Sequence, residues 1–140
     1  MWLILTIFFS LLSAQSMRSA WAQEQFFDFN AEMKQTPPSK RVPNTKVKMI
    51  IDSPPGFRVR VIHFKEQHEK ETTHRNNGAH ILYVVDGEGT VIVEGRETPV
   101  KAGSIVHVPK GLWHDWRTKG EMRVLDFQQP VHTETIAKTK

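Results

Sequence analysis

From residue 46 onward, apolar and polar residues alternate with a period of two, and short turn sequences interrupt the pattern. A period of two places successive side chains on opposite faces of a strand, so each such segment indicates a half-buried β-strand. The segments are 46–51, 57–63, 80–85, 90–93, 97–100, 104–108, 113–117 and 122–128. Asp86–Gly89 has the composition of a hairpin turn, and Pro109–Gly111 marks a second turn. Short strands at spacings of about 8–12 residues predict an all-β sandwich or small barrel.

The first 22 residues have a different composition. Trp2–Ala14 is almost wholly apolar, and Ala20-Trp21-Ala22 forms an A-x-A site before the polar Gln23. This order is typical of a secretory signal peptide, which predicts cleavage after Ala22 and a periplasmic or secreted protein. About thirteen apolar residues are too few to cross a bilayer, which needs about twenty, so we expect no stable membrane span after cleavage. Because no Lys or Arg precedes the apolar run, a buried N-terminal helix and an uncleaved anchor stay open as alternatives.

The remainder of the chain divides into three parts. Residues 23–45 combine Phe26, Phe27 and Phe29 with three prolines, which predicts an extended arm with little regular structure. We expect the three aromatic rings of this arm to pack on the domain. Residues 46–128 contain the predicted strands and form the barrel, and residues 129–140 form a C-terminal tail.

Composition limits the chemistry of the chain. A length of 140 residues suits one compact domain. The absence of cysteine excludes disulfides, thiolate metal sites and cysteine nucleophiles, so a metal site would need nitrogen and oxygen ligands. The net charge of +4 comes from 19 Lys and Arg against 15 Asp and Glu, but the cations are scattered along the chain. With no cluster of basic residues and no nucleic-acid motif, we expect a solvated basic surface and no nucleic-acid partner.

Histidines in two clusters are the candidate ligands. His74 and Asn76 are two residues apart and face the same way in an extended chain, and the Asn77-Gly78 turn can bring His80 back toward them. His114 follows the Pro109–Gly111 turn at the start of the next strand. Three imidazoles that meet inside a barrel can bind Zn, Fe, Cu or Ni. The alternative on spacing alone is a set of hydrogen-bonded core histidines.

The second cluster has the spacing G-x5-P-x-G-x2-H and resembles the second motif of the cupin superfamily, through Gly103, Pro109, Gly111 and His114. The first cluster resembles a degenerate first motif, His74-x-Asn76-x3-His80-x6-Gly87. The resemblance extends over about residues 46–128 and is to small quercetin dioxygenase-like cupins. It implies an all-β fold, a single-domain cupin-type β-barrel with a jelly-roll-like double sheet.

The resemblance also implies a ligand set. In the family, two His and a Glu of the first motif and a His of the second hold a divalent metal. Here His74 and His114 keep their positions, whereas Asn76 replaces the second His and His80 replaces the Glu. The resemblance therefore implies a divalent transition metal at His74, Asn76, His80 and His114. Without a carboxylate ligand the site suits Fe, Ni, Cu or Zn better than Mn. Alternatively, the site is a polar pocket that has lost its metal.

The positions of the other histidines and of three aromatic residues can also be predicted. His107 is a candidate catalytic acid or base, on condition that it faces inward. Trp116 shares the parity of His114 and is expected in the cavity wall, while Tyr83 and Trp113 are expected in the core or at the rim. The remaining histidines are expected at the surface or in the tail: His63, His68 and His132.

Two functions stay open at this point. The first is an exported, metal-dependent, dioxygenase-like enzyme that acts on a small organic substrate. The second is a non-catalytic module that binds a small molecule or a metal in the same cavity, because one fold hosts both classes. The resemblance also implies a homodimer paired through sheet edges, to which the arm with its phenylalanines would contribute.

Overall fold

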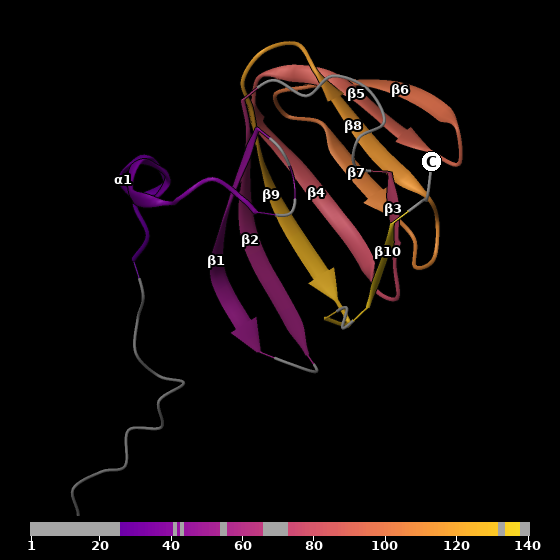
Figure 1. The fold of residues 1–140 in the computed structure, drawn as a ribbon, viewed down its shortest axis with the longest axis horizontal. Coiled ribbons are helices and arrows are strands. Elements are labelled where there is room, and N and C mark those ends of the chain that lie inside the picture. Colours follow the sequence, from indigo (N-terminus) through magenta and orange to yellow (C-terminus); the bar gives the residue numbers. More distant parts are fainter. Residues whose placement is uncertain are drawn as a thin grey trace, which may run out of the picture.

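The structure is a computed structural model and describes residues 26–40, 42, 44–53, 56–65, 73–131 and 134–137. Within these residues, ten strands form two antiparallel sheets that enclose a common core (Figure 1). The order in the first sheet is β1 (Thr45–Ser53), β2 (Phe57–Phe64), β9 (Met122–Gln129), β4 (Ala79–Asp86) and β7 (Ile105–Val108). The order in the second is β10 (Thr135–Ala137), β3 (His74–Asn76), β8 (His114–Thr118), β5 (Glu88–Val93) and β6 (Arg96–Lys101). The predicted all-β fold, a cupin-type double sheet, is confirmed.

Each of the eight segments predicted from the alternation corresponds to a strand. The two further strands, β3 and β10, have three residues each, which is too short for a period of two to be recognised. They pair with each other through Thr135–Asn76, Ile136–Arg75 and Ala137–His74. The segment predicted as a C-terminal tail therefore contributes a strand to the second sheet.

The Asp86–Gly89 turn differs from the prediction. Strand β4 pairs with β7 and β9 in the first sheet, whereas β5 pairs with β6 and β8 in the second, so the chain changes sheets here and makes no hairpin. Gly87 has φ +81°, and a Cβ atom at this position would lie 2.3 Å from the carbonyl oxygen of Glu121. The crossing thus requires a residue without a side chain, for reasons of both backbone conformation and space.

The N-terminal arm is not extended throughout, because it contains helix α1 (Phe29–Gln35). Asp28 caps this helix, since its side chain accepts a hydrogen bond from the backbone N–H of Ala31 at 2.9 Å. With seven residues and Met33 as its buried side chain, the helix is too short to show a helical period in the sequence. The available signal for it was Asp28 itself, a residue type that favours the N-cap position, directly before Phe29.

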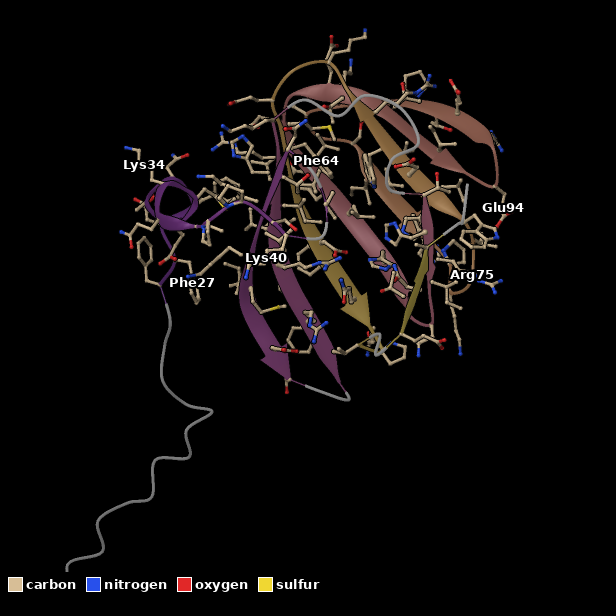
Figure 2. The ribbon with its side chains drawn as sticks, in the orientation of Figure 1. Phe27, Lys34, Lys40, Phe64, Arg75 and Glu94 are labelled. Atoms are coloured by element: carbon tan, nitrogen blue, oxygen red, sulfur yellow. The ribbon has the colours of Figure 1, made fainter. Side chains whose placement is uncertain are left out.

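Helix α1 lies against the outer face of the first sheet, beside β1 (Figures 1 and 2). Lys46 donates from Nζ to the carbonyl oxygen of Met33 at 2.9 Å, which ties the helix to β1. A small apolar space lies between the helical segment and strands β1, β2 and β9. Its apolar lining comprises Phe27, Phe29, Met33, Ile50, Val59, Val61 and Leu125. Phe26 is 91% exposed, so the expected packing holds for two of the three phenylalanines.

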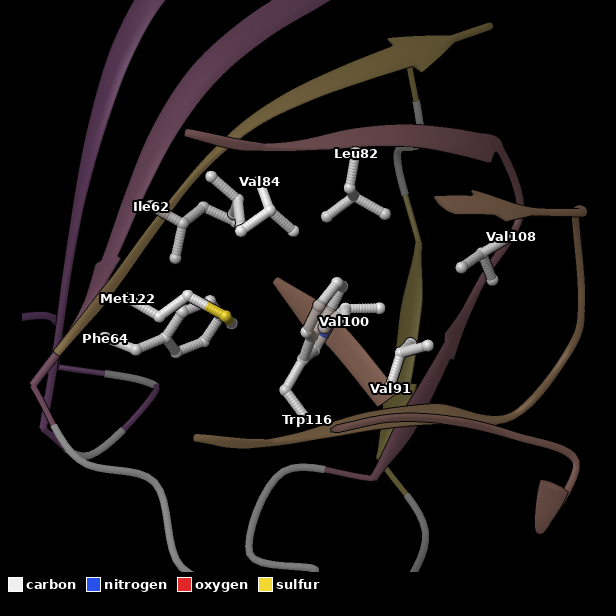
Figure 3. Close-up of a cluster of buried hydrophobic side chains, with 10 residues drawn as sticks. Ile62, Phe64, Leu82, Val84, Val91, Val100, Val108, Trp116 and Met122 are labelled. Carbon is white, nitrogen blue, oxygen red and sulfur yellow. The ribbon is translucent and has the colours of Figure 1, made fainter. Parts of the chain in front are cut away.

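The core lies between the sheets and consists of the inward-facing side chains of the alternating strands (Figure 3). Phe64 and Trp116, from opposite sheets, stack with ring centroids 6.0 Å apart. Ten buried residues form the main cluster: Ile62, Phe64, Leu82, Val84, Val91, Val100, Val108, Trp116, Met122 and Val124. The core fills one part of the barrel and leaves the other part to polar side chains.

Three of the expectations concern residues that the structure does not describe. The predicted signal peptide, residues 1–22, and the two histidines His68 and His132 lie outside the described residues. In the part of the chain that is described, no helix has the length and apolar character needed to cross a membrane.

The sheet crossing at Gly87 generates a stability prediction. Gly87→Ala should destabilise the protein more than Gly103→Ala, although both positions have positive φ, +81° and +86°. The left-handed conformation should cost about 1–2 kcal/mol at each site. The clash with the backbone of Glu121 and Met122 should add about 1–3 kcal/mol at Gly87 alone, because a Cβ at Gly103 meets nothing within 4 Å. Urea unfolding of both variants measures the difference, and equal losses would contradict the role assigned to Gly87.

Candidate functional site

A cavity of about 360 Å³ opens between the two sheets. One part of its wall is polar and carries His74, Asn76, His80, His114, Asp126, Arg60, Thr73 and Thr135. The other part is apolar and includes Val47, Ile62, Phe64, Leu82 and Trp116. A cavity that is mostly apolar with a few convergent polar groups is the usual form of a small-molecule site.

The structure brings together the four residues that the motifs singled out. His74 on β3 lies opposite His114 on β8 in the strand register, and their ring centroids are 4.3 Å apart. His80, on β4 of the other sheet, has its ring centroid 5.4 Å from that of His114. Asn76 is next to His80, since its Nδ2 lies 2.8 Å from Nε2 of that ring. The short link between β3 and β4 crosses from one sheet to the other, which explains why residues four apart meet across the cavity.

A buried carboxylate holds the ring of His80. Nδ1 of His80 lies 2.9 Å from Oδ1 of Asp126 on β9, a residue with no solvent exposure. The other oxygen of Asp126 accepts from Nε of Arg60 at 2.5 Å and from Nε2 of Gln128 at 2.7 Å. Burial on its own would raise the pKa of Asp126, but the hydrogen bond from His80 and the charge of Arg60 hold it well below its usual range. Asp126 is therefore ionised, and its Oδ1 accepts a hydrogen bond from the Nδ1–H group of His80.

The hydrogen bonds also show whether the second ring nitrogen of His80, Nε2, donates or accepts. Oδ1 of Asn76 accepts from the hydroxyl of Thr135 at 2.5 Å, which turns the Nδ2 group of Asn76 toward His80. An amide nitrogen only donates, so Nε2 of His80 must accept and carries the lone pair. The polar chain thus runs from Asp126 through His80 and Asn76 to Thr135.

His114 is fixed in a comparable way. Its Nδ1 donates to the carbonyl oxygen of Leu112 at 2.9 Å, and a neutral ring with a proton on Nδ1 has its lone pair on Nε2. Burial and the nearby charge of His74 lower the pKa of His114 to about 4, against the opposing effect of the Leu112 carbonyl. His114 is therefore neutral at pH 7 and can act as a ligand through Nε2.

These donors can be compared with what a metal ion requires. Among the described residues, no group of three or more His, Asp or Glu side chains is arranged to hold a metal ion. The donor chemistry nevertheless fits, because metal-binding imidazoles usually donate their other N–H to a carboxylate or a backbone carbonyl, as His80 and His114 do here. The ring centroids of His74 and His80 lie 4.3 Å and 5.4 Å from that of His114, so the three rings are neighbours in the cavity wall. Asn76 would have to turn its Nδ2 group away from His80.

His107 does not belong to this site. Its side chain is exposed on β7, and it is absent from the cavity wall. The prediction of a catalytic acid or base depended on an inward orientation, and the strand register gives the opposite one, because Val108 next to it is fully buried. Trp116 does line the cavity, as its parity with His114 predicts. Tyr83 is 40% exposed, so it is not part of the core.

Sequence reasoning missed Asp126, Arg60 and Thr135. A signal existed for the first, because Asp126 occupies an inward position of β9, in phase with the buried Met122 and Val124. A charged residue at a core position of a strand indicates a function. Arg60 likewise is in phase with Ile62 and Phe64 on β2. Thr135 gave no such signal, since β10 was not recognised as a strand.

Residues 60–127 match the family model described as the cupin domain. A 5-nitrosalicylic acid 1,2-dioxygenase from Bradyrhizobium sp. is 29% identical over 84 residues, which cover 49% of this chain and 41% of that enzyme. A salicylate 1,2-dioxygenase variant from Pseudoaminobacter salicylatoxidans, solved in complex with gentisate, has a TM-score of 0.65 at 17% identity. That superposition covers 79% of this chain and 33% of the dioxygenase.

A further solved structure is of similar size. An RmlC-like cupin from Shewanella frigidimarina has a TM-score of 0.62 at 24% identity, over 78% of this chain and 94% of its own. This chain spans less than half the length of the two dioxygenases that it matches. Structural similarity at these identities shows a shared fold, and the family model independently matches the residues that form the barrel. Together the two findings show that residues 60–127, just under half of the chain, belong to a cupin domain.

Proposed function

We propose that this protein is an exported small cupin that binds a divalent transition metal and a small organic molecule in its barrel, as a dioxygenase-like enzyme. The observation that carries the proposal is the convergence of His74, His80 and His114 on one polar wall of an otherwise apolar cavity. The apolar N-terminal segment supports export. Exposed Phe26 and Ile105 support dimerisation as part of the same proposal.

The residues of the site have distinct tasks in this proposal. Nε2 of His80 and of His114, together with His74, would hold the ion, and Asn76 would be a weak fourth ligand or a hydrogen-bond donor to the substrate. A bound divalent ion would supply a Lewis acid that polarises a substrate oxygen. Asp126 fixes the tautomer of His80, and the Leu112 carbonyl fixes that of His114. Trp116 and its apolar neighbours exclude water from the remainder of the cavity.

The second candidate function is a metal-free binding module. It is favoured by the hydrogen bond between Asn76 and Nε2 of His80, which occupies the lone pair that a metal would need. Oxygen uptake by the iron-loaded protein with a flavonol or another enediol-type compound separates the two candidates. Oxygen uptake that His114→Ala abolishes supports the enzyme. Binding of such compounds by chelator-treated protein, with no oxygen uptake after iron is added, supports the module.

Metal binding is the first prediction of the proposal. Protein purified without an affinity tag and titrated separately with Fe²⁺, Ni²⁺, Cu²⁺ and Zn²⁺ should bind one equivalent of at least one of them. His114→Ala should abolish the binding, and Asp126→Asn should weaken it by about 10–100-fold, because it removes the acceptor that orients His80. His107→Ala is the matched control and should keep full stoichiometry, since its side chain is exposed outside the cavity. Elemental analysis and calorimetry measure these values, and a wild-type protein that binds none of the four ions would refute the proposal.

The neutral state of His114 generates a pH prediction for the metal-free protein. Its pKa is about 4 in the folded state and about 6.5 when unfolded, so the unfolded chain binds more protons between these values. The free energy of unfolding should therefore fall by about 3 kcal/mol as the pH drops from 6.5 to 4, through this residue alone. His114→Gln should remove that part of the slope, and His107→Gln should not. Urea unfolding in the presence of a chelator measures the slope, and NMR titration of the His114 ring gives the same pKa independently.

A further inference from the structure

Arg60 is the single Arg or Lys among the described residues that line the cavity. It lies on β2 directly opposite Asp126 in the strand register, and one-fifth of its side chain is exposed. Ile62 and Phe64 follow on the same face of the strand, so Arg60 stands where the polar wall meets the apolar one. The charge of Arg60 is thus presented to the same space as the histidines.

Asp126 uses only one edge of the guanidinium group. In the described part of the chain, Nε is the one nitrogen of Arg60 with a hydrogen-bonded partner, Oδ2 of Asp126. Asp126 cannot turn further toward Arg60, because it also accepts from His80 and Gln128. The two terminal NH₂ groups of Arg60 therefore have no protein acceptor among the described residues. Partly buried donors of this kind favour a ligand that accepts hydrogen bonds.

The geometry and charge of this group indicate which ligand it suits. A planar carboxylate accepts two parallel hydrogen bonds from one guanidinium group. Arg60 already shares its charge with Asp126, so the site can add one negative charge more easily than two. A phosphate would bring more negative charge and more hydrogen-bond acceptors than the two remaining NH₂ groups of Arg60 can satisfy. Beyond Arg60, the wall of Ile62, Leu82 and Trp116 suits an apolar body.

We propose that the ligand of the cavity is a small organic acid whose carboxylate is bound by the terminal NH₂ groups of Arg60 and whose apolar body packs against Trp116. This inference rests on the proposed small-molecule function of the cavity, but it does not require that a metal is bound. Arg60 acts in it as the residue that determines specificity for an anionic ligand. If a divalent ion is present as well, its charge attracts the same carboxylate.

The experiment compares two ligands of the same shape that differ in charge. Calorimetric titration of the full chain with benzoate and benzamide, and then with salicylate and salicylamide, should show tighter binding of each acid than of its amide. Arg60→Gln should weaken binding of the acids by about 10–100-fold, as expected for the loss of hydrogen bonds between charged groups, and leave the amides unchanged. Arg60→Lys keeps the charge opposite Asp126 without the planar fork, so it should give an intermediate loss.

Arg58→Gln is the matched control. Arg58 lies on the same strand and is paired with Asp52, outside the cavity wall, so its replacement should leave the affinity for the acids unchanged. Thermal unfolding shows whether Arg60→Gln has a folding defect. If it does, the affinity of Arg60→Lys for the acids is compared with that of the wild type instead. Equal affinity of the wild type for acid and amide, acid binding that neither Arg60 variant alters, or no binding of either acid would overturn the proposal. The titrations are repeated on chelator-treated and Zn²⁺-loaded protein, so that a failure of metal binding is distinguished from a failure at Arg60.

Discussion

The polar half of the barrel depends on the buried carboxylate of Asp126. An ionised carboxylate with no solvent exposure is costly unless it is paired and hydrogen-bonded. Three donors meet this requirement here, from His80 on β4, Arg60 on β2 and Gln128 on β9 itself. The three neighbouring strands of the first sheet are thereby linked through one side chain. Removal of Asp126 would leave Arg60 without its ionic partner and His80 without an acceptor, so the carboxylate organises the site as well as the sheet.

The position of the site follows from how polarity changes along the strands. Inward-facing residues pass from polar to apolar along β2 from Arg60 to Phe64, along β4 from His80 to Val84, and along β8 from His114 to Trp116. In β9 the order is reversed, from Met122 to Gln128, because it runs antiparallel to β2 and β4. The register aligns these gradients, so polar ends gather at one end of the barrel and apolar ends form the core. A single cavity wall thus combines a charged part with an apolar part.

Much of this arrangement could be predicted from the sequence, and the failures have specific physical causes. The period of two locates eight strands and gives the parity of Trp116, since each side chain alternates with its neighbour. The histidines could be grouped because turns separate them by few residues. Helix α1, β3 and β10 are too short to show a period, and the crossing at Gly87 depends on contacts with Glu121, which is distant in the sequence. Asp126 is 46 residues from His80, so local spacing could not connect the two.

In the proposed metal site, Asn76 would compete with the metal ion for Nε2 of His80. Its amide donates to Nε2 of His80 and is held in place by Thr135. The hydrogen bond from the side-chain amide of Asn76 to Nε2 of His80 is one neutral hydrogen bond, and its net contribution to stability is about 0.5–1.5 kcal/mol. An ion at the proposed site would have to displace this hydrogen bond, so the amide would raise the metal concentration that binding requires. A histidine at position 76 would compete for no lone pair and would add a ligand. In the proposed site, Asn76 would therefore weaken the affinity for metal and leave the hydrogen bond between Asp126 and His80 intact.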